Sequence, residues 1–509
     1  MSPKTIAGAA LAPLLFAAAC GPGEETGAPE IERTGLAAIQ ERGELVVLTT
    51  RGPTIYQEGL DGRARGYEVD LARAFAEDLG VEVSFIVFDD LSGVLDAIQD
   101  GEGDIAAAGI TRTDRLAAVY DFAAAYKNVD ENVITRRGGL EVEDVSDLAG
   151  ADMAVVAQSS YVDSLEALRE ANPGIDWIEV EAASAMPLLA QVQAEELDAT
   201  IADSNVVAHA RLEYPELLAP INLAEDKPYA WITAPDSEDL IDALDIWFSR
   251  AHSDGLLEEL DEKWYGHTIE EFDYVDVRRF IRRIDERLPE YREAFEEAAD
   301  QYGLDWRWLA AQGYQESHWD ADARSPTGVR GLMMLTLPTA GELGVKDRTD
   351  PYESIRGGAQ YMANMMRRIP EGVRGQDRLF KAMAAYNVGL GHVRDARRLA
   401  EAQGLNADAW PDVRRTLPLL SEPEYYKDLP YGYARGGEPV HYVRNIRRYK
   451  ALLDMHLPPD ADELERSFEI EAEAEGDLPE TPTYTGPFPV DDDEADADAE
   501  DENAEDGDG

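Results

Sequence analysis

Residues 66–80 read Gly-Tyr-Glu-Val-Asp-Leu-Ala-Arg-Ala-Phe-Ala-Glu-Asp-Leu-Gly, a periodic run between two glycines. Its apolar residues recur at the three- and four-residue spacing of an amphipathic helix. Short apolar runs typical of strands flank it at 45–49 and 81–88. Strands separated by helices imply a parallel sheet with crossover connections. This stretch therefore predicts an α/β fold for its part of the chain.

The same strand–helix pattern continues along the chain. A helix is expected at 91–98 and a strand at 105–110, and a similar block recurs over 153–203. Two such blocks predict two α/β lobes. A helical stretch, 237–264, follows them.

Beyond about residue 270 the pattern becomes entirely helical, with Gly and Pro between the segments. The first segment carries five arginines interleaved with Asp285 and Glu286, which favours a solvated linker helix. We therefore expect a multidomain chain, with a two-lobed α/β domain followed by an all-α domain. The segments with helical spacing are 278–287, 290–302, 306–317, 354–368, 379–388 and 440–452.

Length and charge limit the classes of protein that fit. The 509 residues suggest about three domains, and 44% hydrophobic residues suffice for sizeable cores. The chain has 46 basic and 104 acidic residues, a net charge of −58, which disfavours nucleic acid as a partner. Residues 490–509 hold 12 acids and no base, so we expect a disordered acidic tail.

The N-terminus has the pattern of a secretory signal. Residues 6–19 form an apolar stretch of 14 that ends in small residues before Cys20, the single cysteine. This resembles a bacterial lipoprotein signal, which implies a lipid on Cys20, and Gly21 after it favours sorting to the outer membrane, facing the periplasm. The alternative is an ordinary signal peptide cut nearby. A lone cysteine excludes a disulfide framework.

Several segments in the first half together resemble the family 3 solute-binding domain. They are the run at 66–80, then Gly103-Asp104-Ile-Ala-Ala-Ala-Gly-Ile-Thr-Arg-Thr-Asp-Arg115, Asp121-Phe122 with Tyr126, and Leu197-Asp-Ala199 with Asp203. The resemblance covers about residues 42–267. It implies a periplasmic module that clamps a zwitterion, such as an amino acid or muropeptide, between two lobes.

The resemblance assigns a role to each residue of that clamp. Thr111 and Arg115 would hold the carboxylate and Asp203 the ammonium group, while Ser159 and Ser160 would donate N–H groups. Tyr56 would stack on the ligand side chain. The stretch from Thr111 to Arg115 is one residue shorter than the family's pattern, so the clamp arginine is Arg115, Arg112 or neither. Asp203 could equally serve as a helix N-cap.

One helix of the second half carries a carboxylate on its apolar face. Trp306, Leu309, Gly313 and Glu316 are spaced three, four and three apart and therefore share a face. Burial raises the pKa of a carboxyl toward the range of a general acid. The alternative is an ion-paired structural glutamate.

The residues around Glu316 resemble the Slt-type lytic transglycosylases, a lysozyme-like helical fold, over about 288–455. The resemblance rests on Glu316-Ser-His-Trp319, Ser325-Pro-Thr-Gly328, Gly331-Leu-Met-Met-Leu335, Ala385-Tyr-Asn-Val-Gly389 and the stretch 438–446. It implies cleavage of peptidoglycan between N-acetylmuramic acid and N-acetylglucosamine. Glu316 would protonate the glycosidic oxygen and then deprotonate the muramoyl C6 hydroxyl, giving a 1,6-anhydro end without water.

The resemblance also assigns the walls of the cleft. Ser325 would bind near the acetamido group, and Tyr386 and Asn387 would shape the cleft beside Glu316. Met333, Met334 and Tyr442 would line it, although Tyr442 fits a helix core better. His318 lacks partners at metal-ligand spacing and fits a solvated or capping residue, so no metal or cofactor is expected.

Three functions remain open at this point. They are a peptidoglycan lyase regulated by its binding module, a muramidase that uses water, and a binding lipoprotein with an inactive catalytic half. Most glycosidases need two carboxylates, and the motifs supply one, which favours the lyase. The expected units are a signal peptide at 1–19, a tether at 20–41, the binding domain at 42–267, a linker helix at 268–287, the catalytic domain at 288–455 and the tail at 456–509.

Overall fold

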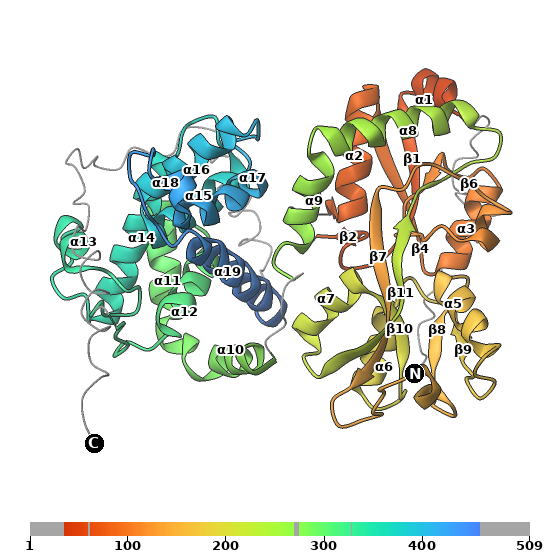
Figure 1. Cartoon of the computed structure of the whole chain (residues 1–509), viewed down its shortest axis with the longest axis horizontal. Coiled ribbons are helices and arrows are strands. Elements are labelled where there is room, and N and C mark those ends of the chain that lie inside the picture. The colour runs from red at the N-terminus through yellow and green to blue at the C-terminus, as the bar shows by residue number, and fades with distance from the viewer. Residues whose placement is uncertain (1–34, 60–61, 269–273, 327, 459–509) are drawn as a thin grey trace, which may run out of the picture.

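The computed structural model describes residues 35–59, 62–268, 274–326 and 328–458. An α/β part and an all-helical part lie side by side (Figure 1). The predicted fold class, a two-lobed α/β domain followed by a helical domain, is confirmed. The signal sequence with Cys20 and most of the acidic tail lie outside the described residues.

The first lobe is built on a five-stranded sheet with the order β4-β1-β5-β12-β6. β1 runs parallel to β4 and β5, while β12 is antiparallel to its neighbours. The expected helix between Gly66 and Gly80 is α2, which buries Leu71 and Phe75 against the sheet. The elements are β1 Glu44–Thr50, β2 Gln57–Glu58, β3 Ala64–Arg65, α2 Tyr67–Leu79, β4 Glu82–Phe88, α3 Leu91–Gln99, β5 Ile105–Ala106, α4 Asp114–Ala117, β6 Asp121–Phe122 and β12 Ile232–Thr233.

The second lobe contains a three-stranded antiparallel sheet, β10-β7-β11, and a parallel pair, β8-β9. The long strands β7 and β11 run through both lobes (Figure 1). The expected helix at 237–264 is divided into α8 and α9 at Gly255, whose φ of 84° favours glycine. The elements are β7 Lys127–Arg136, η1 Val145–Leu148, β8 Ala154–Val156, α5 Ser160–Arg169, β9 Ile178–Val180, α6 Met186–Gln193, β10 Thr200–Asp203, α7 Ser204–Glu213, β11 Leu217–Tyr229, α8 Glu238–Ser253 and α9 Leu256–Tyr265.

The expected tether ends earlier than residue 41. Leu36–Arg42 form the helix α1, which belongs to the core of the first lobe. Ile39 is fully buried there. Burying this apolar side chain stabilises the helix, which a solvated tether could not do.

The helical part has one main core, to which α10 to α12, α14 to α17 and α19 contribute, and a small separate cluster that includes Ala340 of α13. All six predicted helical segments match helices that begin within about four residues of the expected position. The elements are α10 Tyr274–Glu286, α11 Leu288–Tyr302, α12 Trp306–Ser317, α13 Leu337–Glu342, α14 Pro351–Arg368, α15 Gly375–Val388, α16 Leu390–Ala402, α17 Trp410–Thr416, η2 Leu417–Ser421, α18 Pro423–Tyr426 and α19 Gly437–His456.

α10 departs from the expected solvated linker. Its arginines are exposed or half-buried, but Val277, Phe280 and Ile284 are buried in the core of the helical part. The Phe280 ring lies 4.7 Å from that of Tyr449 and 4.5 Å from that of Tyr314, centroid to centroid. The charged residues of 278–287 thus form only the outer face of an amphipathic helix.

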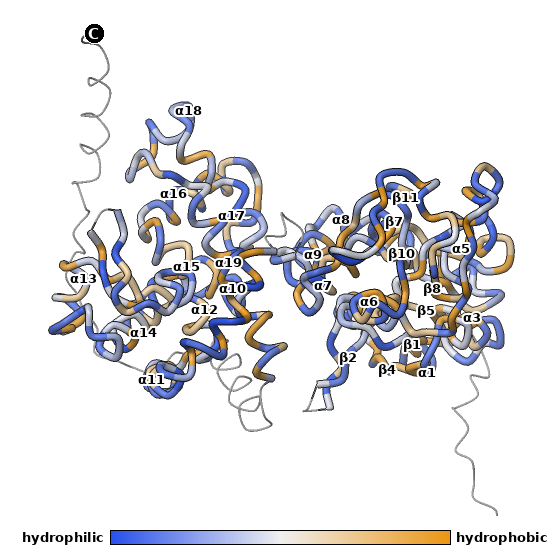
Figure 2. Tube along the Cα trace, turned by 90° about the horizontal axis from the view of Figure 1, so that it is seen from below, coloured by the Kyte–Doolittle hydropathy of each residue, from blue (hydrophilic) through white to orange (hydrophobic). Residues whose placement is uncertain are grey.

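The two parts meet where α7 packs on α19 and α9 packs on α17 (Figure 2). The Tyr274 hydroxyl of α10 also donates to Glu216, just before β11, at 2.7 Å. At the centre, Glu262 of α9 accepts hydrogen bonds from the guanidinium of Arg447 in α19. Both side chains are 5% exposed, and Arg414 lies 3.1 Å from the same carboxylate. A buried, hydrogen-bonded ion pair therefore joins the two parts. Within the described residues, no helix has the length and apolar character needed to cross a membrane.

Candidate active site

Helix α12 carries Glu316 to the edge of the helical core. Asp305 caps its first turn by accepting a hydrogen bond from the Arg307 N–H at 2.7 Å. His318, an exposed residue with a φ of 55°, follows the last residue of the helix and caps it, which agrees with the capping interpretation of this histidine. The indole of Trp319 returns to the helix and donates to the Ala310 carbonyl at 2.8 Å. The end of the helix, and with it Glu316, is thereby held in place.

The Glu316 carboxylate is half-buried and is hydrogen-bonded to a tyrosine. Burial raises the pKa of Glu316 to about 7, and the hydrogen bond that Tyr442 donates to Oε1 opposes that rise. The charge of Glu316, added to burial, raises the pKa of both Tyr442 and Tyr386. A carboxyl with this pKa can give and take a proton near neutral pH.

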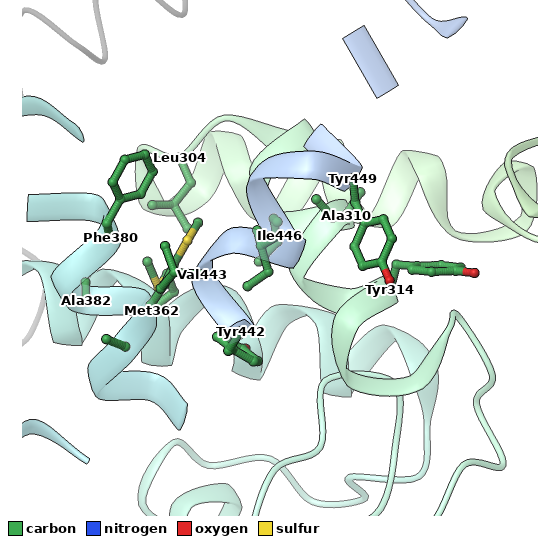
Figure 3. Close-up of a cluster of buried hydrophobic side chains, with 14 of the residues drawn as sticks. Leu304, Ala310, Tyr314, Met362, Phe380, Ala382, Tyr442, Val443, Ile446 and Tyr449 are labelled. Atoms are coloured by element: carbon green, nitrogen blue, oxygen red, sulfur yellow. The ribbon is translucent and has the colours of Figure 1, made fainter. Parts of the chain in front are cut away.

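Tyr442 itself is fixed from a second side. It lies on α19, which packs between α12 and α15 through Val443, Ile446 and Tyr449 (Figure 3). Gln312, only 1% exposed, donates a hydrogen bond to the Tyr442 hydroxyl at 3.1 Å. Sequence reasoning did not include Gln312 in the site. Its position one helical turn before Glu316 was the signal that could have found it.

The expected cleft residue Met333 instead belongs to the core. Its side chain is fully buried and packs against Gly313 and Gly358, because neither glycine has a Cβ to obstruct it. Its main chain supports the site, since the Met333 N–H donates to Ser354 Oγ at 3.0 Å and its carbonyl accepts from the Tyr386 hydroxyl at 2.8 Å. Met333 therefore positions Tyr386 rather than lining the cleft. 

The other expected cleft residues keep more exposure. Met334 is half-buried and has a φ of 45°. Ser325 is half-buried, and its Oγ accepts from the Val329 N–H at 2.9 Å, closing its own turn. Tyr386 is half-buried, and Asn387 is exposed near the end of α15. The roles of Ser325 and Asn387 beside Glu316 remain predictions.

We expect Gly358→Ala to lower the free energy of unfolding by about 1–2 kcal/mol, as overpacking does in a close-packed core. An added Cβ would lie 2.7–2.8 Å from three carbons of Met333, and the gain in helix propensity would offset only part of that clash. Urea unfolding measures the change. Gly341→Ala on α13, where a Cβ meets nothing within 4 Å, is the control and should be neutral or stabilising. Equal effects of the two substitutions would contradict the packing argument.

In the α/β part, Arg115 joins the two lobes directly. From the first lobe its guanidinium reaches Asp163 Oδ1 at 2.8 Å and Gln158 Oε1 at 2.9 Å, and it also binds the carbonyls of Gln158 and Ser159. Arg112 instead lies over the ring of Phe122, in its own lobe. Of the two candidate arginines, Arg115 is therefore the one that faces the second lobe.

Asp203 is the last residue of β10 and is 4% exposed. It occupies the N-cap position of α7, but its side chain makes no capping bond. Oδ2 instead accepts hydrogen bonds from the hydroxyls of Tyr161 and Tyr229, at 2.9 and 2.5 Å. Burial, reinforced by the charge of Glu131, raises the pKa of Asp203 to about 7 despite these bonds.

Glu131 is a second buried carboxylate that sequence reasoning missed. It is directly opposite Asp203 in the β7–β10 ladder, so the two side chains share a face of the sheet. Within the described residues, Asp203 Oδ1 and Glu131 Oε1 are both buried without a hydrogen-bond partner. Such groups are costly to bury, so this face is suited to a ligand with several donors.

The remaining expected clamp residues come from both lobes of the α/β part. Thr111 is buried, and its backbone forms an antiparallel β-bridge with Tyr229. Ser159 and Ser160 are buried at the start of α5, where Ser159 Oγ donates to the Val156 carbonyl at 2.6 Å. The half-buried Tyr56 has its ring 5.6 Å from that of Phe85. Among the described residues, no group of three or more His, Cys, Asp or Glu is arranged to hold a metal ion.

Comparisons with known proteins match the α/β part and the helical part of the chain to two different families. Residues 45–267 match the family "Bacterial extracellular solute-binding proteins, family 3", and residues 293–408 match the "Transglycosylase SLT domain". A Maricaulis maris protein named membrane-bound lytic murein transglycosylase F is 50% identical over 88% of this chain and 99% of its own length. Membrane-bound lytic murein transglycosylase F 1 of Alkalilimnicola ehrlichii is 45% identical over 84% of this chain and 86% of its own. An ancestral arginine-binding protein bound to arginine is similar at 22% identity and a TM-score of 0.41, covering 44% of this chain and 99% of that one.

Proposed function

The chain belongs to the membrane-bound lytic murein transglycosylase F family, and we propose that Glu316 is the single acid–base group with which it cleaves peptidoglycan. The chain is thus a lytic transglycosylase, a lyase, with a solute-binding domain. The observation that carries the assignment of Glu316 is its half-buried carboxylate, which a tyrosine hydroxyl holds at the edge of an apolar core.

The proposed reaction needs only one carboxyl. Protonated Glu316 gives its proton to the glycosidic oxygen as the bond from that oxygen to the muramoyl C1 breaks. The resulting carboxylate then takes the proton of the C6 hydroxyl, whose oxygen closes onto C1 to form the 1,6-anhydro ring. The carboxyl ends as it began, and no water is consumed.

The electrostatic surroundings of Glu316 support a mechanism with a single carboxyl. Among the described residues, burial and Tyr442 are the influences on the pKa of Glu316, and no second carboxylate or cation contributes. A hydrolase of the two-carboxylate kind would place another acid beside it. Ser325, Tyr386, Asn387 and Met334 are proposed to contact the sugar around Glu316.

Mass spectrometry of the products tests the proposed reaction. The chain from residue 21 onward is incubated with purified sacculi, and the released sugars are analysed. Anhydromuramoyl ends are expected. Reducing muramoyl ends would mean hydrolysis by water and would overturn the one-carboxyl mechanism.

For the solute-binding domain, we propose a ligand with an ammonium group, such as an amino acid or a muropeptide. Its N–H donors would satisfy the buried oxygens of Asp203 and Glu131 that have no partner within the described residues. Its carboxylate would compete with Asp163 for the Arg115 guanidinium. The two ends of a zwitterion would thus be held by opposite charges, the ammonium group by Asp203 and Glu131 and the carboxylate by Arg115.

We expect Asp203→Asn to weaken binding of the best L- or D-amino acid or muropeptide at least about 30-fold, because one partner of a buried charge pair is lost. Titration calorimetry across a panel of these compounds measures the affinity. Asp176→Asn, at an exposed aspartate of the same lobe, is the control and should bind as the wild type does. Equal affinities of the two variants, or no binding of any compound by the wild type, would contradict the proposal.

Membrane attachment is proposed to depend on a lipid at Cys20, since the curated relatives are named membrane-bound. A single acyl chain gives only marginal binding, so the multiple chains of a lipoprotein would be needed. We expect Cys20→Ala to move the protein from the membrane to the soluble fraction of bacterial cells. A variant that stays with the outer membrane would show another means of attachment.

A further inference from the structure

Three side chains form a hydrogen-bonded row that ends at the carboxylate of Glu316. Gln312 Nε2 donates to the Tyr442 hydroxyl, and that hydroxyl donates to Glu316 Oε1. Gln312 is 1% exposed and Tyr442 is 5% exposed, so the first part of the row is sheltered from water. Glu316, at the end of the row, is half-buried and can meet a substrate.

We propose that Gln312 is a positioning residue that fixes the direction of the Tyr442–Glu316 hydrogen bond, leaving Glu316 Oε2 as the oxygen that carries the transferred proton. The inference rests on the proposed role of Glu316 as acid and base. It adds to that role the choice of which carboxyl oxygen does the chemistry.

The argument follows from the donors and acceptors available. An amide NH₂ can only donate, so Tyr442 must use an oxygen lone pair toward Gln312. The single hydroxyl proton of Tyr442 is then directed to Glu316 Oε1. Because Oε1 already accepts this bond, a proton on the neutral carboxyl belongs on Oε2.

If the hydrogen bonds of the row ran in the opposite direction, Glu316 could not act as the acid. If Tyr442 donated its proton to residue 312, it could only accept from Glu316, and the carboxyl proton would sit on Oε1. That proton would be held by the tyrosine in the buried row and turned away from the glycosidic oxygen. The amide nitrogen of Gln312 prevents this arrangement by occupying the tyrosine lone pair.

Backbone geometry makes the row rigid. Gln312 and Glu316 lie four residues apart on α12, so both face the same helix, α19. Tyr442 reaches between them from α19, which Val443, Ile446 and Tyr449 anchor in the core (Figure 3). During the proposed reaction the hydroxyl of Tyr442 continues to donate to Oε1, while Oε2 loses the proton to the glycosidic oxygen and regains one from the C6 hydroxyl.

The test compares Gln312→Met, Tyr442→Phe and the double variant by the pH profile of anhydromuramoyl product formation. Among the described residues, the groups that face Glu316 are Tyr442 from α19 and Tyr386 from α15, with Gln312 on its own helix linked through Tyr442. Gln312→Met should lower kcat about tenfold with little change in KM, since a hydrogen bond to a charged group is only partly lost. The alkaline limb of kcat/KM should move up by about 0.5 pH unit, because Tyr442 no longer donates to the carboxylate all of the time.

The double variant separates positioning from packing. In the Tyr442→Phe background, Gln312→Met should shift the alkaline limb no further, because the group through which it acts is gone. Gln301→Met, at an exposed glutamine that contacts Tyr302 on α11, is the control and should leave rate and pH profile unchanged.

Two outcomes would overturn the inference. One is an alkaline limb that stays at the wild-type pH in Gln312→Met, whether or not kcat and thermal stability fall. The other is an equal shift in both backgrounds. Failure of the proposed function looks different, because the wild type would then release no anhydromuramoyl ends or Glu316→Gln would stay active.

Discussion

Replacing Glu316 with glutamine is expected to lower kcat for release of anhydromuramoyl ends by at least about 10³-fold, within the range that a positioned acid and base contributes. Glutamine keeps the size of the side chain and can still accept a hydrogen bond from Tyr442 at its amide oxygen, but it cannot give or take a proton. Quantitative mass spectrometry of digested sacculi measures the loss. Glu297→Gln, at an exposed glutamate of α11, is the control and should remain fully active.

The same substitution should change the pH dependence of stability in a defined direction. Because the pKa of Glu316 is raised from 4.5 to about 7 in the folded protein, folding favours its neutral form. Its contribution to the free energy of unfolding is therefore full below pH 4.5 and is lost as the pH rises through 7. We expect Glu316→Gln to gain stability relative to the wild type between pH 5 and pH 8, as measured by urea unfolding.

Activity gives an independent check of that pKa. The first step needs the protonated carboxyl, so wild-type kcat/KM should fall as the pH rises above about 7. An inactive Glu316→Gln whose stability profile matches the wild type at every pH would contradict the buried-acid account. An active variant would remove Glu316 from the mechanism.

The second large effect is expected at the junction of the two parts. Arg447→Leu should lower the free energy of unfolding by about 3–5 kcal/mol, the usual cost of removing one partner of a buried ion pair. The guanidinium of Arg447 binds the Glu262 side chain and the carbonyl of Glu262, and it also lies 4.6 Å from the centre of the Phe380 ring. Its loss would leave the Glu262 carboxylate buried with Arg414 as its remaining cation.

Urea unfolding of the full chain, followed by tryptophan fluorescence, measures this effect. Arg282→Leu breaks an exposed pair with Glu286 and is the control, with an expected cost below about 1 kcal/mol. The double variant Arg447→Leu/Glu262→Leu should recover part of the loss, because no unpaired carboxylate is then buried. A cost for Arg447→Leu no larger than that of Arg282→Leu would show that the junction does not depend on this pair.

Much of this architecture could be predicted from local sequence. Apolar spacing between glycines indicated α2, and the positions of Trp306, Leu309 and Gly313 indicated that Glu316 shares their face of α12. These features depend on helical periodicity, which is a property of residues three and four apart. The amphipathic character of α10 was present in the same pattern, but its charged residues concealed the buried Phe280.

The partners of the functional groups depended on tertiary structure. Tyr442 lies 126 residues from Glu316 along the chain, and only the packing of α19 on α12 brings its hydroxyl to the carboxylate. Packing against Gly358 likewise takes the Met333 side chain out of the cleft. The sequence by itself therefore determined which face of α12 carries the acid. Only the tertiary structure decided its protonation and its hydrogen-bond partner, because desolvation and directional bonds depend on which distant side chains are packed around a group.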